Sequence, residues 1–124
     1  MADFRPFRGL RYNPRKVSFE KVVTQPYDKI SRDMQDRYYA LDPHNIVRVI
    51  LGRSLEGDTG DNNVYTRAAA TLQEWRAAGV IEPMPGSSFV ACFQRFTIPG
   101  TTQQRLRKGF IGLGRLEDYS KKIV

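Results

Sequence analysis

The chain has 124 residues, a formal net charge of +7 and a hydrophobic content of 40%. This length corresponds to one domain with its own core, and seven Phe, six Tyr and one Trp argue against a disordered chain. The single cysteine, Cys92, excludes an internal disulfide framework. No apolar run is long enough for a signal peptide or a membrane span. We therefore expect a cytoplasmic protein with no membrane partner.

The elements expected in the first part of the chain are short. Alternating apolar and polar residues at 4–8 predict a strand, and residues 17–23 fit either a helical turn or a strand. Ser31 is a candidate N-cap for a helix that runs to about Leu41. Residues 44–51 are rich in β-branched side chains and stop at a glycine, so they predict a strand.

The second half contains the clearest periodicity. A helix is expected after Asp61 or Asn62 as the N-cap, with Gly79 as its left-handed C-terminal cap. Residues 89–98 and 106–116 predict two strands of a long hairpin. These elements predict a single α+β domain over residues 1–124, in which a mixed β-sheet with a C-terminal hairpin packs against two main helices.

The charge is distributed unevenly. Five basic residues lie between residues 5 and 16 and seven lie between 95 and 122, whereas residues 54–94 carry two arginines and five acids. Two basic ends suit a phosphate, a nucleotide or a nucleic acid. Alternatively, these side chains lie on solvated strand edges, where Lys and Arg block pairing with another sheet.

Two clusters carry the candidate chemistry. In the first, Arg8 and Arg11 flank the turn at Gly9, which suits a phosphate or a carboxylate. In the second, Tyr27 and Asp28 precede a possible helix start, where Asp28 is able to accept a proton or bind a cation. The alternative for Asp28 is that it only caps the turn.

Other reactive residues are few. One His and one Cys do not make a multi-ligand zinc site, so no metal site is assigned. His44 follows a Pro turn and is either a binding residue or a turn cap. Cys92 is expected to be a buried thiol. The glycines of residues 109–114 lack the helix and Lys of a phosphate loop, so a bulge or close sheet packing is expected there.

Several of these segments, in this order, resemble the domain-of-unknown-function family 1015 of bacteria and archaea. The resemblance rests on PFRGLRY (6–12), PYD (26–28), IS (30–31), PHNIVR (43–48), LG (51–52), YTRAAA (65–70), Trp75, GFI (109–111) and RLEDY (115–119). Gln25 and Lys29 depart from the family pattern, in which a second Pro and a Val are common.

The resemblance implies more than the residues alone. Members of the family are several times longer, and a Pro-His-Glu motif usually follows the Glu-Asp-Tyr segment, so the chain is expected to be an N-terminal part whose remainder follows Val124. Some relatives are labelled as similar to chromosome-partitioning ParB proteins, whose N-terminal fold also serves nucleotide-dependent enzymes, including a serine kinase.

The leading functional hypothesis is binding of a phosphate-bearing small molecule or nucleotide, as part of a metabolic enzyme such as a small-molecule kinase. Phosphate would be held by Arg8 and Arg11 beside Gly9, with Tyr27 nearby. The expected catalytic residues are Asp28, as base or Mg²⁺ ligand, and His44, with Asn45 and Arg48 completing the pocket. The alternatives are a nucleic-acid-binding regulatory module that uses the basic ends, or a structural interaction domain.

Overall fold

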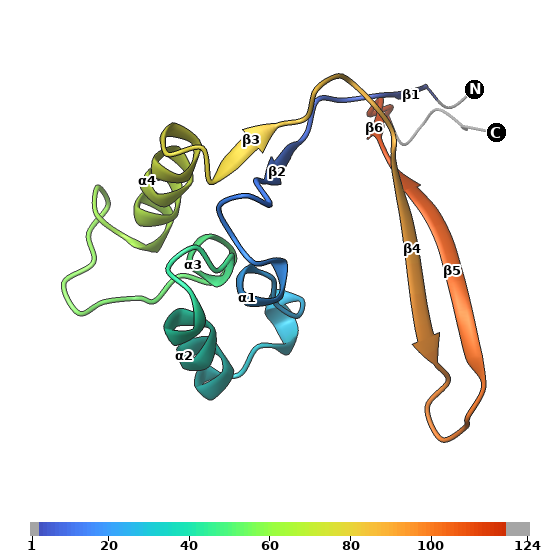
Figure 1. Ribbon diagram of the computed structural model, residues 1–124. Coiled ribbons are helices and arrows are strands. Elements are labelled where there is room, and N and C mark those ends of the chain that lie inside the picture. The colour runs from blue at the N-terminus through green and yellow to red at the C-terminus, as the bar shows by residue number, and fades with distance from the viewer. Residues whose placement is uncertain (1–2, 119–124) are drawn as a thin grey trace. The chain divides into compact units, whose positions relative to one another are not determined.

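The computed structural model describes residues 3–118, which form two compact units. We call residues 10–82 the helical unit and residues 3–9 with 83–118 the hairpin unit (Figure 1). The elements in chain order are β1 (Phe4–Arg5), β2 (Leu10–Tyr12), α1 (Phe19–Val22), the 3-10 helix η1 (Tyr27–Lys29), α2 (Arg32–Leu41), α3 (Val47–Ile50), α4 (Val64–Ala77), β3 (Ile81–Pro83), β4 (Val90–Thr97), β5 (Gln104–Ile111) and β6 (Leu113–Gly114).

The two main helices begin where side chains cap them. The Ser31 hydroxyl accepts a hydrogen bond from the backbone N–H of Met34, which confirms the predicted start of α2. Helix α4 begins one or two residues later than predicted, because Asn63 and Thr66 form a reciprocal capping box. The helix ends as expected at Gly79, whose φ of 66° is the left-handed conformation that glycine adopts without strain.

The predicted strand at residues 44–51 is wrong. Residues Val47–Ile50 form helix α3, despite their β-branched side chains. The side-chain oxygen of Asn45 accepts a hydrogen bond from the Val47 N–H at 3.0 Å, and its amide donates to the Lys21 carbonyl at 2.6 Å. Tertiary contacts of this kind override strand propensity, which is a weak preference.

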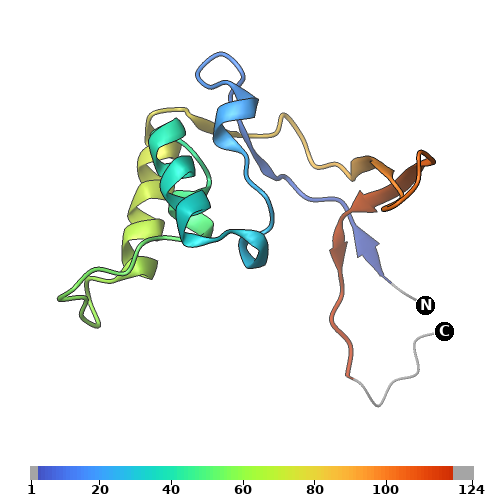
Figure 2. The same ribbon diagram turned by 90° about the horizontal axis from the view of Figure 1, so that it is seen from below.

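The core of the helical unit is small and lies around Trp75. Val80 and Ile81 are buried with it, and partly buried residues pack against this cluster: Tyr12, Val17, Ile46, Val49 and Leu72. Strand β2 pairs with β3, and neither strand was predicted. The loop of residues 51–63 between α3 and α4 extends away from the helices in both views (Figures 1 and 2).

The hairpin unit contains two strand pairs. Strands β4 and β5 are antiparallel from the pair Val90–Ile111 to the pair Thr97–Gln104, which confirms the predicted hairpin. Strand β1 pairs with β6, and the rings of Phe4 and Phe89 each meet Phe110 edge to face. A Cβ at Gly112 would lie 2.7 Å from the Phe89 ring, so this glycine permits close packing as expected.

The α+β class predicted from the sequence is confirmed, with the strands of the described residues distributed over three two-stranded sheets. Cys92 lies within β4, but it is half-buried where a buried thiol was expected. Between residues 3 and 118, no helix is long and apolar enough to cross a membrane.

Candidate anion-binding site

The helical unit contains a pocket of about 220 Å³ whose polar wall is dominated by arginine. It lies where the 51–63 loop meets α2, α3 and α4. The residues lining it are Tyr39, Arg48, Gly52, Arg53, Leu55, Val64, Arg67 and Thr71. Three guanidinium groups at one pocket make it a candidate site for an anion, because guanidinium presents several donors to phosphate or carboxylate oxygens.

The phenol ring of Tyr39 supports two of these arginines. The guanidinium carbon of Arg48 lies 4.5 Å from the ring centroid, and that of Arg53 lies 4.2 Å from it. Both distances are within the range of cation–π attraction. The Tyr39 hydroxyl also accepts a hydrogen bond from the Arg53 backbone N–H at 3.2 Å. Tyr39, on α2, therefore positions side chains that come from α3 and from the loop.

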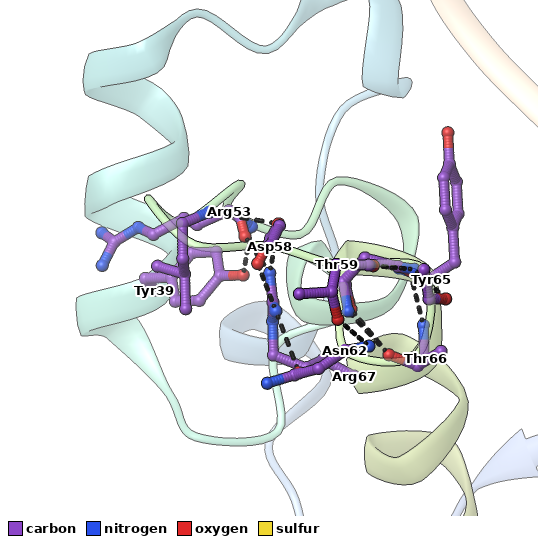
Figure 3. A network of polar contacts seen from close by, with 11 residues as sticks. Tyr39, Arg53, Asp58, Thr59, Asn62, Tyr65, Thr66 and Arg67 are labelled. Carbon is purple, nitrogen blue, oxygen red and sulfur yellow. Dashed lines mark hydrogen bonds and ion pairs between the residues drawn. The ribbon is translucent and has the colours of Figure 1, made fainter.

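Arg67, on α4, is held by a carboxylate from the loop (Figure 3). Its two terminal nitrogens bind the Asp58 carboxylate at 2.7 and 3.0 Å, and one of them also donates to the Arg53 carbonyl at 2.9 Å. The hydrogen bonds from Arg67 lower the pKa of Asp58, and those to Asp58 raise the pKa of Arg67. Arg67 therefore joins the loop to α4.

The charges at the pocket do not cancel. Arg67 is paired with Asp58 and Arg53 with Asp36, which leaves Arg48 without a carboxylate partner among the described residues. One terminal nitrogen of Arg48 donates to the Tyr39 carbonyl at 2.9 Å. Its Nε is buried and has no hydrogen-bond partner. A buried donor without an acceptor is uncommon and costs free energy.

Of the residues predicted for the site, only Arg48 lines this pocket. Asn45 is fully buried, and its side chain is used to hold α1 and the start of α3. The His44 Nδ1 lies 3.4 Å from the Asp42 carboxylate, its carbonyl accepts from the Tyr12 hydroxyl at 2.7 Å, and its ring meets Trp75. Asn45 and His44 therefore both make contacts that hold the fold of the helical unit.

Tyr27 and Asp28 lie on η1 and are exposed. In residues 3–118, neither side chain makes a hydrogen bond or ion pair, and no such contact joins Asp28 to His44. The catalytic roles of Asp28 and His44 stay predictions. No group of three or more His, Cys, Asp or Glu residues that could hold a metal ion occurs in the described part of the chain.

The arginine cluster near the chain start is divided between the two units. Arg8 belongs to the hairpin unit, where its Nε donates to the Met84 carbonyl at 2.8 Å. The carbonyl of the adjacent Gly9 accepts from the Met84 N–H at 2.8 Å. Arg11 belongs to the helical unit and pairs with Glu82 at 3.1 Å across β2 and β3. Each arginine therefore has a local partner.

Comparison with known families identifies the chain at the family level. The family model described as "Protein of unknown function (DUF1015)" matches residues 4–124. The chain belongs to the DUF1015 family. The resemblance inferred from the sequence motifs is confirmed. No curated protein and no solved structure matches this DUF1015 chain.

Proposed function

We propose that this DUF1015 chain binds a phosphate-bearing small molecule in the arginine pocket of its helical unit. The observation that carries the proposal is the buried, unpartnered Nε of Arg48, which belongs to a guanidinium without a carboxylate partner in the described part of the chain. A phosphate oxygen would supply both the missing acceptor and the missing negative charge.

The other arginines favour phosphate over a simple carboxylate. Arg53 and Arg67 line the same pocket, and each of them forms an ion pair with a single carboxylate. A phosphate group carries more charge and more acceptor oxygens than a carboxylate, so it suits a pocket in which three guanidinium groups meet. The volume of about 220 Å³ admits a small phosphorylated compound. For the whole protein, we propose a corresponding place in a metabolic enzyme such as a small-molecule kinase.

Thermal unfolding with a panel of inorganic phosphate, pyrophosphate and nucleotides tests this proposal. A binding compound at about one hundred times its dissociation constant stabilises the fold by about 2.7 kcal/mol. Arg48→Lys keeps the charge but removes the Nε donor, so we expect it to weaken binding by about tenfold or more. Arg76→Gln removes an exposed charge from α4 and serves as the control that retains binding.

Two outcomes would contradict the proposal. In one, no member of the panel shifts the unfolding midpoint of the unmodified chain. In the other, Arg48→Lys and Arg76→Gln respond to the ligand as the unmodified chain does, which would place the binding elsewhere. Circular dichroism of each variant without ligand separates lost binding from lost folding.

A further inference from the structure

The hairpin unit contains a group of basic residues in a stretch of sequence that has no acidic residue. Between Pro83 and Leu116 the sequence contains five basic residues and no Asp or Glu. Four of the five lie on the β4–β5 hairpin: Arg95, Arg105, Arg107 and Lys108. Among residues 3–118, none of these four takes part in an ion pair. The hairpin is therefore a ribbon of positive charge that is not neutralised locally.

Two aromatic residues of the hairpin each lie directly across from a cation. Phe93 pairs with Lys108 and Phe96 pairs with Arg105 in the strand register. Residues directly opposite each other in an antiparallel pair share a face, and successive pairs alternate between faces. Phe93 and Phe96 therefore lie on opposite faces, and each face presents an aromatic ring beside a positive charge. Phe93 is 64% exposed and Phe96 is 43% exposed.

A third cation lies close to the second ring. The guanidinium carbon of Arg107 is 5.9 Å from the centroid of the Phe96 ring. These two residues, with Phe93, Gln94 and Arg95, line a shallow hollow of about 590 Å³ on the hairpin. A ligand that matches this hollow has a planar ring that stacks on phenylalanine and a negative charge that pairs with arginine.

We infer that the β4–β5 hairpin binds single-stranded nucleic acid. Unpaired bases provide flat rings that stack on aromatic side chains, and the phosphates between them provide the charge. The bases of a duplex are already stacked on each other, so they would leave the exposed rings of Phe93 and Phe96 without a role. An acidic polypeptide would meet the four cations but has no matching ring for each phenylalanine.

This inference is independent of the proposed phosphate pocket. The pocket lies in the helical unit and the hairpin in the other unit. Arg48→Lys is therefore expected to leave the affinity for nucleic acid unchanged, and hairpin substitutions are expected to leave the response to small phosphates unchanged. Each proposal can fail without the other.

Fluorescence anisotropy with labelled twelve-nucleotide strands, dT12 and rU12, tests the inference on the whole chain. Single-strand binding releases counterions with a logarithmic slope of about −0.7 per phosphate contact, so four cations predict a salt slope of about −3. The double variant R105Q/R107Q is expected to halve that slope. The control R37Q/R76Q removes the same charge from exposed positions on α2 and α4 and is expected to change the slope little.

Stacking is tested separately from charge. The double variant F93L/F96L keeps apolar bulk and all charges but removes the flat rings. We expect it to bind the strands at least about fivefold more weakly, with the salt slope unchanged. Circular dichroism verifies that each variant keeps the strand content of the unmodified chain.

Several results would overturn the inference. One is the absence of binding at 50 mM salt, and another is an equal loss in R105Q/R107Q and R37Q/R76Q. Tighter binding of a blunt duplex than of the single strands, or full affinity in F93L/F96L, would remove the role of stacking. Equal affinity for poly-glutamate would show attraction to charge alone.

Discussion

The helical unit and the hairpin unit of this DUF1015 chain are stabilised in different ways. In the described residues, all buried side chains belong to the helical unit, where Trp75, Val80 and Ile81 form a core and Val22, Asn45 and Val47 are fully buried. The hairpin unit has backbone pairing and three rings in edge contact, but most of its large apolar side chains are exposed. The same type of substitution should therefore lower the free energy of unfolding more in the helical unit than in the hairpin unit.

Val47 in the helical unit and Ile111 in the hairpin unit test this difference; equal losses of stability on truncation to alanine would contradict it. Val47 is fully buried, so Val47→Ala removes two methyl groups from a packed site and should lower the free energy of unfolding by about 2 kcal/mol. Ile111→Ala removes more atoms, but the residue is 53% exposed, so the expected loss is below about 1 kcal/mol. Urea unfolding followed by far-UV circular dichroism measures both.

Two glycines, one in each unit, provide a second test of the difference between the units. A Cβ at Gly52 would lie 2.6 Å from the Val64 Cγ2, so Gly52→Ala should force α3 and α4 apart and cost about 1–3 kcal/mol. A Cβ at Gly109, within β5, would meet no atom within 4 Å. Gly109→Ala should therefore change stability by less than about 0.5 kcal/mol. Trp75 is the only tryptophan, so its fluorescence reports unfolding of the helical unit. An unchanged urea midpoint in Gly52→Ala would contradict the close packing of Gly52 against Val64.

A further prediction concerns the pH dependence of stability in the helical unit. Burial, with a smaller contribution from the Asp42 carboxylate, raises the pKa of Tyr12 to about 12 from 10.0. Tyr12 keeps its proton in the folded chain after the unfolded chain has lost it, so its contribution is complete below pH 10 and is lost as the pH rises through 12.

Tyr12→Phe isolates that contribution, since it removes only the hydroxyl that donates to the His44 carbonyl. The variant should be less stable by about 1 kcal/mol at pH 8, because it lacks this hydrogen bond. The loss is no larger because Tyr12 is partly exposed and solvent weakens the interaction. The difference between the two chains should then narrow between pH 10 and pH 12. A constant difference over this range in urea unfolding would contradict the link to Tyr12 ionisation.

Local signals in the sequence account for the elements that were predicted correctly. Ser31 and Gly79 determine helix ends through contacts within one turn, and the two strands of the β4–β5 hairpin are neighbours in the sequence. Helix α3 was missed because its residues favour strands, while the contact that orders it joins Asn45 to Lys21, far away in the chain. Strands β2 and β3 are three residues each and pair across the whole helical unit.

The candidate site was predictable only in part for the same reason. Arg48 was chosen from the motif that surrounds it, and it lines the pocket. Arg53 and Arg67 were missed. One lies in a loop and the other on a helix, and no sequence pattern indicates that two such residues line the same pocket. Their position depends on Asp58, nine residues before Arg67, and on the Tyr39 ring, which belongs to another helix. The sequence did contain one signal for this site: a carboxylate, Asp58, in a glycine-containing loop that precedes a helix with an arginine, Arg67.

The pairing of β1 with β6 has a consequence for the order of folding. Phe4 pairs with Gly114, about 110 positions away, whereas β4 and β5 are joined by residues 98–103 alone. The entropy lost on closing a loop grows with its length, so contacts of short range form before the distant pair does. The Arg115 amide, which donates to the Asp3 carbonyl at 3.0 Å, should therefore exchange with solvent faster than the paired amides of β4 and β5. We therefore expect β1 and β6 to be the last part of the hairpin unit to assemble and the first to separate.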